Sequence, residues 1–220
     1  MNCFNKSDGN AFAKSDRGVN PSRIIGLTGG IGTGKSTVSH YLASAYHLPI
    51  LDADIYAREA VQIGSPVLKA IAERYGSDIL LPDATLNRRQ LGQIVFGNPD
   101  ERRWLEQQIH PYVRDRFVAA INELLYKKNL VVQHATAVLV VPLLFEAGMT
   151  DLVTEIWVVR CSEQQQLERL MQRDKLTLEQ AQARINSQMP IEEKAARADV
   201  VLDNSSTLEA LLKQVDAALV

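Results

Sequence analysis

The sequence is short of cysteine and of long hydrophobic segments. Its 220 residues include two cysteines, Cys3 and Cys161, and this number is too small for the disulfide framework of a secreted protein. The longest apolar stretch, Ala137 to Phe145, contains Pro142 and has about half the length that a membrane-spanning helix requires. We therefore expect a cytoplasmic protein that does not insert into a membrane.

Basic blocks and metal-binding patterns are also missing. Lys and Arg total 24 against 26 Asp and Glu, which gives a net charge of -2, so the composition provides no electrostatic reason to expect a nucleic acid partner. The four histidines have no zinc-binding spacing. Residues 1–22 are polar and lack the apolar core of a signal peptide. We expect them to form a flexible N-terminal extension.

The rest of the chain, residues 23–220, alternates strand and helix patterns. Apolar runs predict five strands, within residues 23–29, 48–54, 129–142, 155–161 and 198–204. This order predicts an α/β domain with a five-stranded parallel sheet covered by helices on both faces. Residues from about 55 to 128 have helical periodicity, with an interruption expected at Pro111, and we expect an inserted helical substrate-binding subdomain there.

The stretch "GLTGGIGTGKST", Gly26 to Thr37, carries the strongest functional signal. It fits G-x-x-x-x-G-K-[ST] between a predicted strand and a predicted helix, the context in which such a loop wraps its backbone N–H groups around phosphate. We expect Lys35 to reach the β- and γ-phosphates and the Ser36 hydroxyl to bind Mg²⁺. The residues predicted to bind the nucleotide are Gly30, Gly32, Thr33, Gly34, Lys35, Ser36 and Thr37.

A phosphate loop alone does not separate a kinase from a nucleotide switch or a motor ATPase. A kinase needs a group that holds the acceptor and a cationic lid that excludes water. Asp52 and Asp54 end the second predicted strand on the same side of the chain, where one can serve the acceptor; capping of the next helix is the alternative. Arg169, Arg173 and Arg184 lie on a charged helical pair, about residues 162–190, which forms either a lid or a solvated face.

Together these residues resemble the dephospho-coenzyme A kinase family of P-loop kinases. The resemblance runs from Arg23 to about Asn204 and rests on several motifs in order. They are "GLTGGIGTGKST", "DADIYARE" from Asp52 to Glu59, "IHP" from Ile109 to Pro111, "VPLLFE" from Val141 to Glu146, and the segment from Gln172 to Gln188 that contains "QRD" and "RINSQ". The alternatives are a non-enzymatic nucleotide switch and a kinase for another small metabolite or a nucleoside monophosphate.

The resemblance implies that ATP phosphorylates the ribose 3′-hydroxyl of dephospho-coenzyme A, the last step of coenzyme A biosynthesis, with Mg²⁺ as cofactor. It makes Asp54 the acceptor-side base and Arg173 the leading lid arginine, so that Asp54, Lys35 and Arg173 are the expected catalytic residues. The expected acceptor-side residues are Asp54, Arg58, His110 and Glu146. Many family members have an acidic residue just before "PLL", where this chain has Val140 and Val141. That departure leaves Asp54 to serve the outer shell of the metal.

Overall fold

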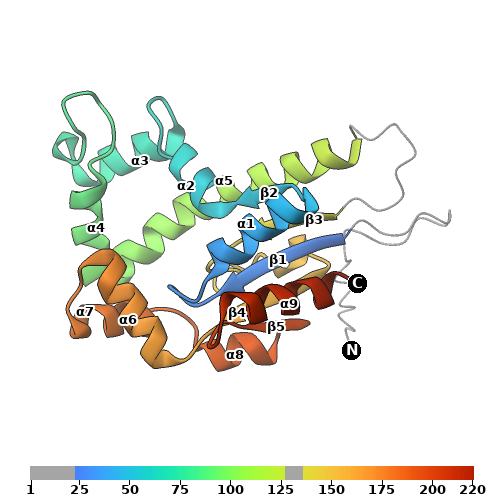
Figure 1. Cartoon of the computed structure of the whole chain (residues 1–220). Helices are drawn as coiled ribbons and strands as arrows, with labels where there is room; N and C mark the ends of the chain where they lie inside the picture. Colours follow the sequence, from blue (N-terminus) through green and yellow to red (C-terminus); the bar gives the residue numbers. More distant parts are fainter. Residues whose placement is uncertain (1–22, 127–135) are drawn as a thin grey trace, which may run out of the picture.

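The computed structural model describes residues 23–126 and 136–220 (Figure 1). Its centre is one parallel sheet with the strand order β2-β3-β1-β4-β5. The strands are β1 Arg23–Gly29, β2 Ile50–Asp52, β3 Thr136–Val140, β4 Glu155–Arg160 and β5 Val200–Asp203. The predicted five-stranded parallel sheet is confirmed. The predicted N-terminal extension lies outside the described residues, as does the part of the third predicted strand before Thr136.

Strand β1 lies in the middle of the sheet, where the strand order changes direction. Leu27 pairs with Val140 of β3 on one side and with Trp157 of β4 on the other. In parallel α/β sheets the carboxyl ends of the strands on the two sides of such a switch point leave a crevice for the ligand. The phosphate loop leaves β1 at this edge, so the fold places it where a ligand is expected.

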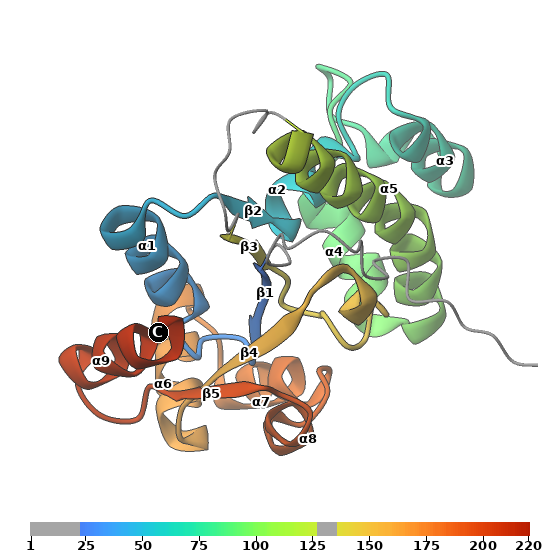
Figure 2. The same cartoon turned by 90° about the vertical axis from the view of Figure 1, so that its right-hand side faces the viewer.

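Alternating residues of the strands supply two separate apolar cores. Ile24 and Leu139 pack on the face covered by α5, together with Phe117 and Leu144. Ile25, the residue after Ile24 on β1, packs on the opposite face, which α1 and α9 cover. Because side chains alternate across a strand, one apolar run feeds both cores. Figure 2 shows α1 and α9 on one side of the sheet and α5 on the other.

Helices connect the strands and extend beyond the sheet. The helices are α1 Lys35–Tyr46, α2 Ala53–Glu59, α3 Pro66–Tyr75, α4 Arg88–Gly97, α5 Pro99–Tyr126, α6 Glu163–Asp174, α7 Leu178–Asn186, α8 Ile191–Ala196 and α9 Leu208–Leu219, with short 3₁₀ turns at Ser77–Ile79 and Thr150–Leu152. Between β2 and β3, α3, α4 and α5 share an apolar cluster of their own that includes Ile71 and Leu91. That these helices form a separate substrate-binding subdomain stays a prediction.

The expected interruption at Pro111 is wrong. Helix α5 runs through this position as one continuous helix. Proline lacks an N–H group, so the helix gives up the bond to the carbonyl of Gln107. Packing of Val113, Phe117 and Ile121 against the sheet holds the helix together on the far side of the proline.

Side-chain caps fix the start of several helices at the positions that the sequence marks. Ser65 accepts from the amide of Leu68 before Pro66 opens α3, and Thr177 forms a capping box with Gln180 at the start of α7. Such caps satisfy amides that have no partner within the helix. None of the helices in the described part of the chain is both long and apolar enough to cross a membrane.

The core under α5 gives a stability prediction. Phe117 has no exposed surface, and its ring lies 5.2 Å from the ring of Tyr56, centroid to centroid. We expect Phe117→Ala to lower the free energy of unfolding by about 3–5 kcal/mol, because the substitution leaves a cavity. Urea denaturation monitored by circular dichroism measures this change.

Val118 provides the matched control, since it is the next residue of α5 and is 39% exposed. We expect Val118→Ala to change the free energy of unfolding by no more than about 0.5 kcal/mol. Equal losses in the two variants would contradict the assignment of this helix face to the core.

Candidate active site

The phosphate loop joins β1 directly to α1. Gly29, Gly32 and Gly34 have φ angles of 146°, 77° and 110°, in the region that glycine adopts far more readily than other residues. Gly34 stands at the N-cap position of α1 and has no side chain to cap the helix. The amides that open α1 are therefore left for a ligand, and the helix N-terminus favours a negatively charged one.

Side chains within the loop hold its shape. Thr33 is buried, and its hydroxyl donates a 2.9 Å hydrogen bond to the carbonyl of Gly30. The Lys35 ammonium donates to the carbonyls of Gly29 and Gly30 at 3.1 and 2.7 Å. Ser36 and Thr37 are exposed at the start of α1. The loop is thus closed on itself, with its two hydroxyl-bearing residues after the lysine open to a ligand.

A cavity of about 920 Å³ opens beside this loop at the carboxyl edge of the sheet. It brings together parts of the chain that are far apart in sequence: the loop, the start of α2, the middle of α5, the turn after β3 and the lid helix α6. The predicted site residues in its lining are Gly32, Gly34, Lys35, Ser36, Thr37, Asp54, His110 and Arg173. The apolar part of the lining, the apolar wall, includes Leu105, Ile109, Val113, Leu143 and Met149.

The two aspartates after β2 have different environments. The Asp52 carboxylate accepts a 2.8 Å hydrogen bond from the amide of Asp54 and caps α2, whereas Asp54 lines the cavity. Burial raises the pKa of Asp54, and the negative charge of Asp52 raises it further, against the opposing charges of Lys35 and Arg58. The capping alternative therefore describes Asp52, and Asp54 is the aspartate placed to meet a ligand.

Positive charge is concentrated around Lys35. The pKa of Lys35 is lowered to about 8, mainly by burial and in addition by the charges of Lys194 and Arg173, while Asp54 and Glu146 oppose the change. A cation held near other cations is stabilised by an anion that enters the same space. The electrostatics of the cavity thus favour a polyanionic ligand such as a nucleotide triphosphate.

One carboxylate holds two of the three arginines of the predicted lid. Asp174 pairs with Arg173 at 2.8 Å and with Arg184 at 2.7 Å, and the two arginines hold the pKa of Asp174 below its usual range. Arg169 donates to the carbonyl of Asn204 at 3.2 Å and lines the cavity beside Arg173. Two arginines of α6 therefore line the cavity. Arg184 is not among the described residues that line it.

The other predicted acceptor-side residues separate into two groups. His110 lines the cavity, and burial lowers its pKa although Glu106 opposes the change. Arg58 and Glu146 are outside the cavity lining formed by the described residues. The charge of Arg58 acts on Asp54, and the Glu146 carboxylate is paired with Lys194 at 2.9 Å. Direct contact of either residue with an acceptor stays a prediction.

Sequence reasoning missed three side chains that contact the loop, those of Gln166, Gln188 and Asn204, and two of them also line the cavity. The Asn204 amide nitrogen donates to the carbonyl of Thr33 at 2.8 Å, and the Gln188 side-chain oxygen accepts from the amide of Ile31 at 2.9 Å. Both residues also line the cavity. Asn204 is the final residue of the last predicted strand, so the rule that ligands collect at the carboxyl ends of parallel strands gave a signal for it. Gln188 lies after a helix, where no comparable rule applies.

A phosphate loop at the switch point of a parallel sheet, in one cavity with an aspartate and the arginines of α6, places the chain in the class of P-loop nucleotide-binding proteins. Residues 23–210 match the family model described as dephospho-CoA kinase. A dephospho-CoA kinase from Trichormus variabilis is 69% identical over 197 residues, covering 90% of this chain and 96% of the relative. One from Synechocystis is 56% identical over 193 residues, covering 88% and 92%. The chain belongs to the dephospho-CoA kinase family.

Solved structures agree with this assignment. A dephospho-CoA kinase from Campylobacter jejuni superposes with a TM-score of 0.65 at 29% identity, covering 89% of this chain and 94% of the other. A protein from Thermus thermophilus superposes with a TM-score of 0.73 at 32% identity, covering 91% and 97%. The resemblance seen in the sequence motifs is thereby confirmed at the level of the family.

The close packing of Gly29 gives a prediction about nucleotide binding. A Cβ atom at this position would lie 2.2 Å from the backbone carbonyl oxygen of Val159 in β4. Strand β4 lies inside the sheet and cannot move aside, so we expect Gly29→Ala to displace the loop. We expect ATP affinity to fall at least about tenfold, a loss whose free energy is that of modest backbone strain. Isothermal titration calorimetry with ATP measures the affinity.

Gly92 is the control, because an added Cβ meets no atom within 4 Å in the part of the chain that the structure describes. It lies inside α4, away from the loop. We expect Gly92→Ala to bind ATP as the unchanged protein does. A Gly29→Ala protein with unaltered affinity would show that the loop does not depend on this close approach.

Proposed function

We propose that this protein transfers the γ-phosphoryl group of ATP to the ribose 3′-hydroxyl of dephospho-coenzyme A, the last step of coenzyme A biosynthesis, in the cytoplasm. The supporting observation is that Lys35, Asp54 and Arg173 line one cavity in a chain of the dephospho-CoA kinase family. Phosphoryl transfer depends mainly on positioning and on neutralising phosphate charge, and the cavity supplies groups for both tasks.

The loop forms the ATP side of the site. The amides that open α1 and the Lys35 ammonium hold the β- and γ-phosphates, and Thr37 supports the α-phosphate side. Lys35 already lies within the loop, bonded to its carbonyls, so a small movement of the ammonium exchanges these partners for phosphate oxygens. The phosphates also relieve the repulsion that lowers the pKa of Lys35.

Asp54 forms the acceptor side. The ribose hydroxyl oxygen attacks the γ-phosphorus, its proton passes to the Asp54 carboxylate, and ADP leaves with the electrons of the broken P–O bond. The raised pKa of Asp54 makes it a stronger base than an ordinary aspartate. Arg58 acts at a distance, since its charge keeps the carboxylate ionised. His110 and the apolar wall contact the remainder of the acceptor.

The residues around the loop fit a magnesium ion that is held mostly by the nucleotide. Within residues 23–126 and 136–220 no cluster of three or more His, Cys, Asp or Glu forms a metal site. Mg²⁺ in phosphoryl-transfer sites needs only one or two protein ligands besides phosphates and water, and the Ser36 hydroxyl and Asp54 line the same cavity. Ser36 is then the direct ligand and Asp54 an outer-shell partner. When bound, the ion neutralises phosphate charge.

Arg173 covers the phosphates when the lid closes. It is paired with Asp174 on the same helix and is exposed, so it exchanges this partner for the transferring phosphoryl group. Closure excludes water, which would otherwise compete with the acceptor hydroxyl for the phosphoryl group.

The position of the new phosphate tests this function. We expect incubation with ATP, Mg²⁺ and dephospho-coenzyme A to give one product that coelutes with coenzyme A in liquid chromatography and has the same fragment masses. Omission of Mg²⁺ and addition of EDTA are expected to stop the reaction. A product with the phosphate on the 2′-hydroxyl, or no product, would contradict the proposal.

The different environments of the two aspartates give a mutational prediction. Asp54→Asn removes the proton acceptor and is expected to lower kcat by about 10²- to 10⁴-fold, the usual range for a general base, in a folded protein. Asn is a good helix cap, so Asp52→Asn is expected to keep kcat within a few-fold. Steady-state coupled assays of ADP release measure both. Equal effects of the two substitutions would show that Asp54 has no special role.

A further inference from the structure

Lys194 is a buried cation that the proposed reaction does not use. It belongs to α8, its side chain is 0% exposed, and its ammonium lies 2.9 Å from the Glu146 carboxylate. The ammonium also donates to the carbonyl of Pro142 at 3.1 Å, and the Thr28 hydroxyl of β1 donates to the same carbonyl. A buried charge is costly unless it is paired and hydrogen-bonded. The position of Lys194 is therefore closely specified by its partners.

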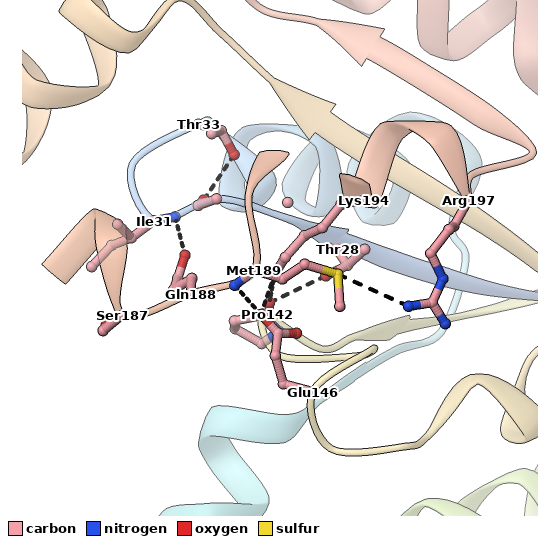
Figure 3. A network of polar contacts seen from close by, with 12 residues as sticks. Thr28, Ile31, Thr33, Pro142, Glu146, Ser187, Gln188, Met189, Lys194 and Arg197 are labelled. Atoms are coloured by element: carbon pink, nitrogen blue, oxygen red, sulfur yellow. Dashed lines mark hydrogen bonds and ion pairs between the residues drawn. The ribbon is translucent and has the colours of Figure 1, made fainter. Parts of the chain in front are cut away.

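Glu146 connects Lys194 to the segment that follows the lid. The same carboxylate accepts a 3.0 Å hydrogen bond from the amide of Met189, in the segment 187–190 between α7 and α8 (Figure 3). Burial alone would raise the pKa of Glu146, but the bonds from Lys194 and from the Met189 amide outweigh it and lower the pKa. The carboxylate thus joins three segments: the turn after β3, α8, and the end of the lid.

The residue before Met189 contacts the phosphate loop. The Gln188 side-chain oxygen accepts from the amide of Ile31, and the carbonyl of Ile31 accepts from the Gln166 side chain of α6 at 2.8 Å. The N–H and the C=O of one loop residue, Ile31, are therefore held by the two ends of the lid, since Gln166 lies near its start and Gln188 at its end. The placement of Gln188 depends on the segment that Glu146 fixes.

We propose that Glu146 and Lys194 are positioning residues for phosphoryl transfer. As a pair they fix segment 187–190 against the turn after β3, which keeps Gln188 on the phosphate loop and sets the place of the lid that carries Arg173. This inference rests on the proposed function, because it concerns the same reaction. It differs from the expectation of a direct acceptor contact, which assigns a role to Glu146 and none to Lys194.

A double-mutant cycle tests the pair. Lys194→Met removes the buried charge with little change in length, and Glu146→Gln keeps an acceptor for the Met189 amide. We expect each variant to lower kcat by about 10- to 100-fold, the size of effect that slight misplacement of reacting groups produces, and to raise the KM for ATP more than the KM for dephospho-coenzyme A. The double variant should be no slower than the slower single variant, because residues that act as one unit are not additive.

A separate ion pair of the same sheet is the control. Glu155 pairs with Arg23 at the opposite end of the sheet and is 18% exposed. Glu155→Gln is expected to lower the unfolding temperature while kcat and both KM values stay unchanged. Hydrogen exchange provides a readout without activity: the amides of Ile31 and Met189 should exchange faster in the Lys194→Met protein and not in the control.

Three results would overturn the inference. Wild-type kcat in the variants, with only a lower unfolding temperature, would make the pair purely structural. A raised acceptor KM in Glu146→Gln alone would establish the acceptor contact. Unchanged exchange at Ile31 and Met189 would disprove the connection to the loop.

In the double variant neither residue of the pair is charged. It therefore serves as the test if a single variant does not fold because its partner is left as an unpaired buried charge. If the wild type does not phosphorylate dephospho-coenzyme A, the proposed function fails, and the exchange data still decide whether the pair holds the loop.

Discussion

Crowding of positive charge at the carboxyl edge of the sheet is the interaction on which the rest of the site depends. Burial lowers the pKa of Lys35, and the charges of Lys194 and Arg173 add to this effect, so that the pKa falls to about 8. Carboxylates pair with two of these three cations. Glu146 neutralises Lys194 and Asp174 holds Arg173, so Lys35 is left to meet a ligand. In the proposed function, a nucleotide triphosphate supplies the negative charge that Lys35 lacks.

Hydrogen bonds also connect the phosphate loop to the segment from α6 to residue 188. The loop is a glycine-rich connection with few side chains to hold it, and its positive φ angles make it conformationally permissive. Besides the bonds that Thr33 and Lys35 make within the loop, Gln166 and Gln188 hold it at Ile31 and Asn204 holds it at Thr33. Preorganised amides cost no reorganisation when charge develops. Residues distant in sequence thus set the catalytic geometry of a short local motif.

Much of this could be predicted from the sequence, because it depends on local patterns. The alternation of apolar strands and helices predicts the parallel sheet, and the loop motif places Lys35 and Ser36 at its edge. The split between Asp52 and Asp54 could not be predicted, because capping and ligand contact use the same residue types at the same spacing. The interruption predicted at Pro111 is wrong, because the packing of α5 on the sheet outweighs the local effect of the proline. Lys194 was missed because a lysine in a charged helical stretch gives no sign of burial.

Acceptor dependence of ADP release tests the central claim most directly. The measurement compares dephospho-coenzyme A with AMP, with adenosine and with no acceptor, at the same ATP and Mg²⁺ concentrations, and weighs each product by mass spectrometry. The account predicts rapid ADP release with dephospho-coenzyme A alone, together with a product heavier by one phosphoryl group. ADP release that is independent of the acceptor would contradict it, because the cavity would then serve ATP hydrolysis and leave Asp54 without an acceptor to deprotonate.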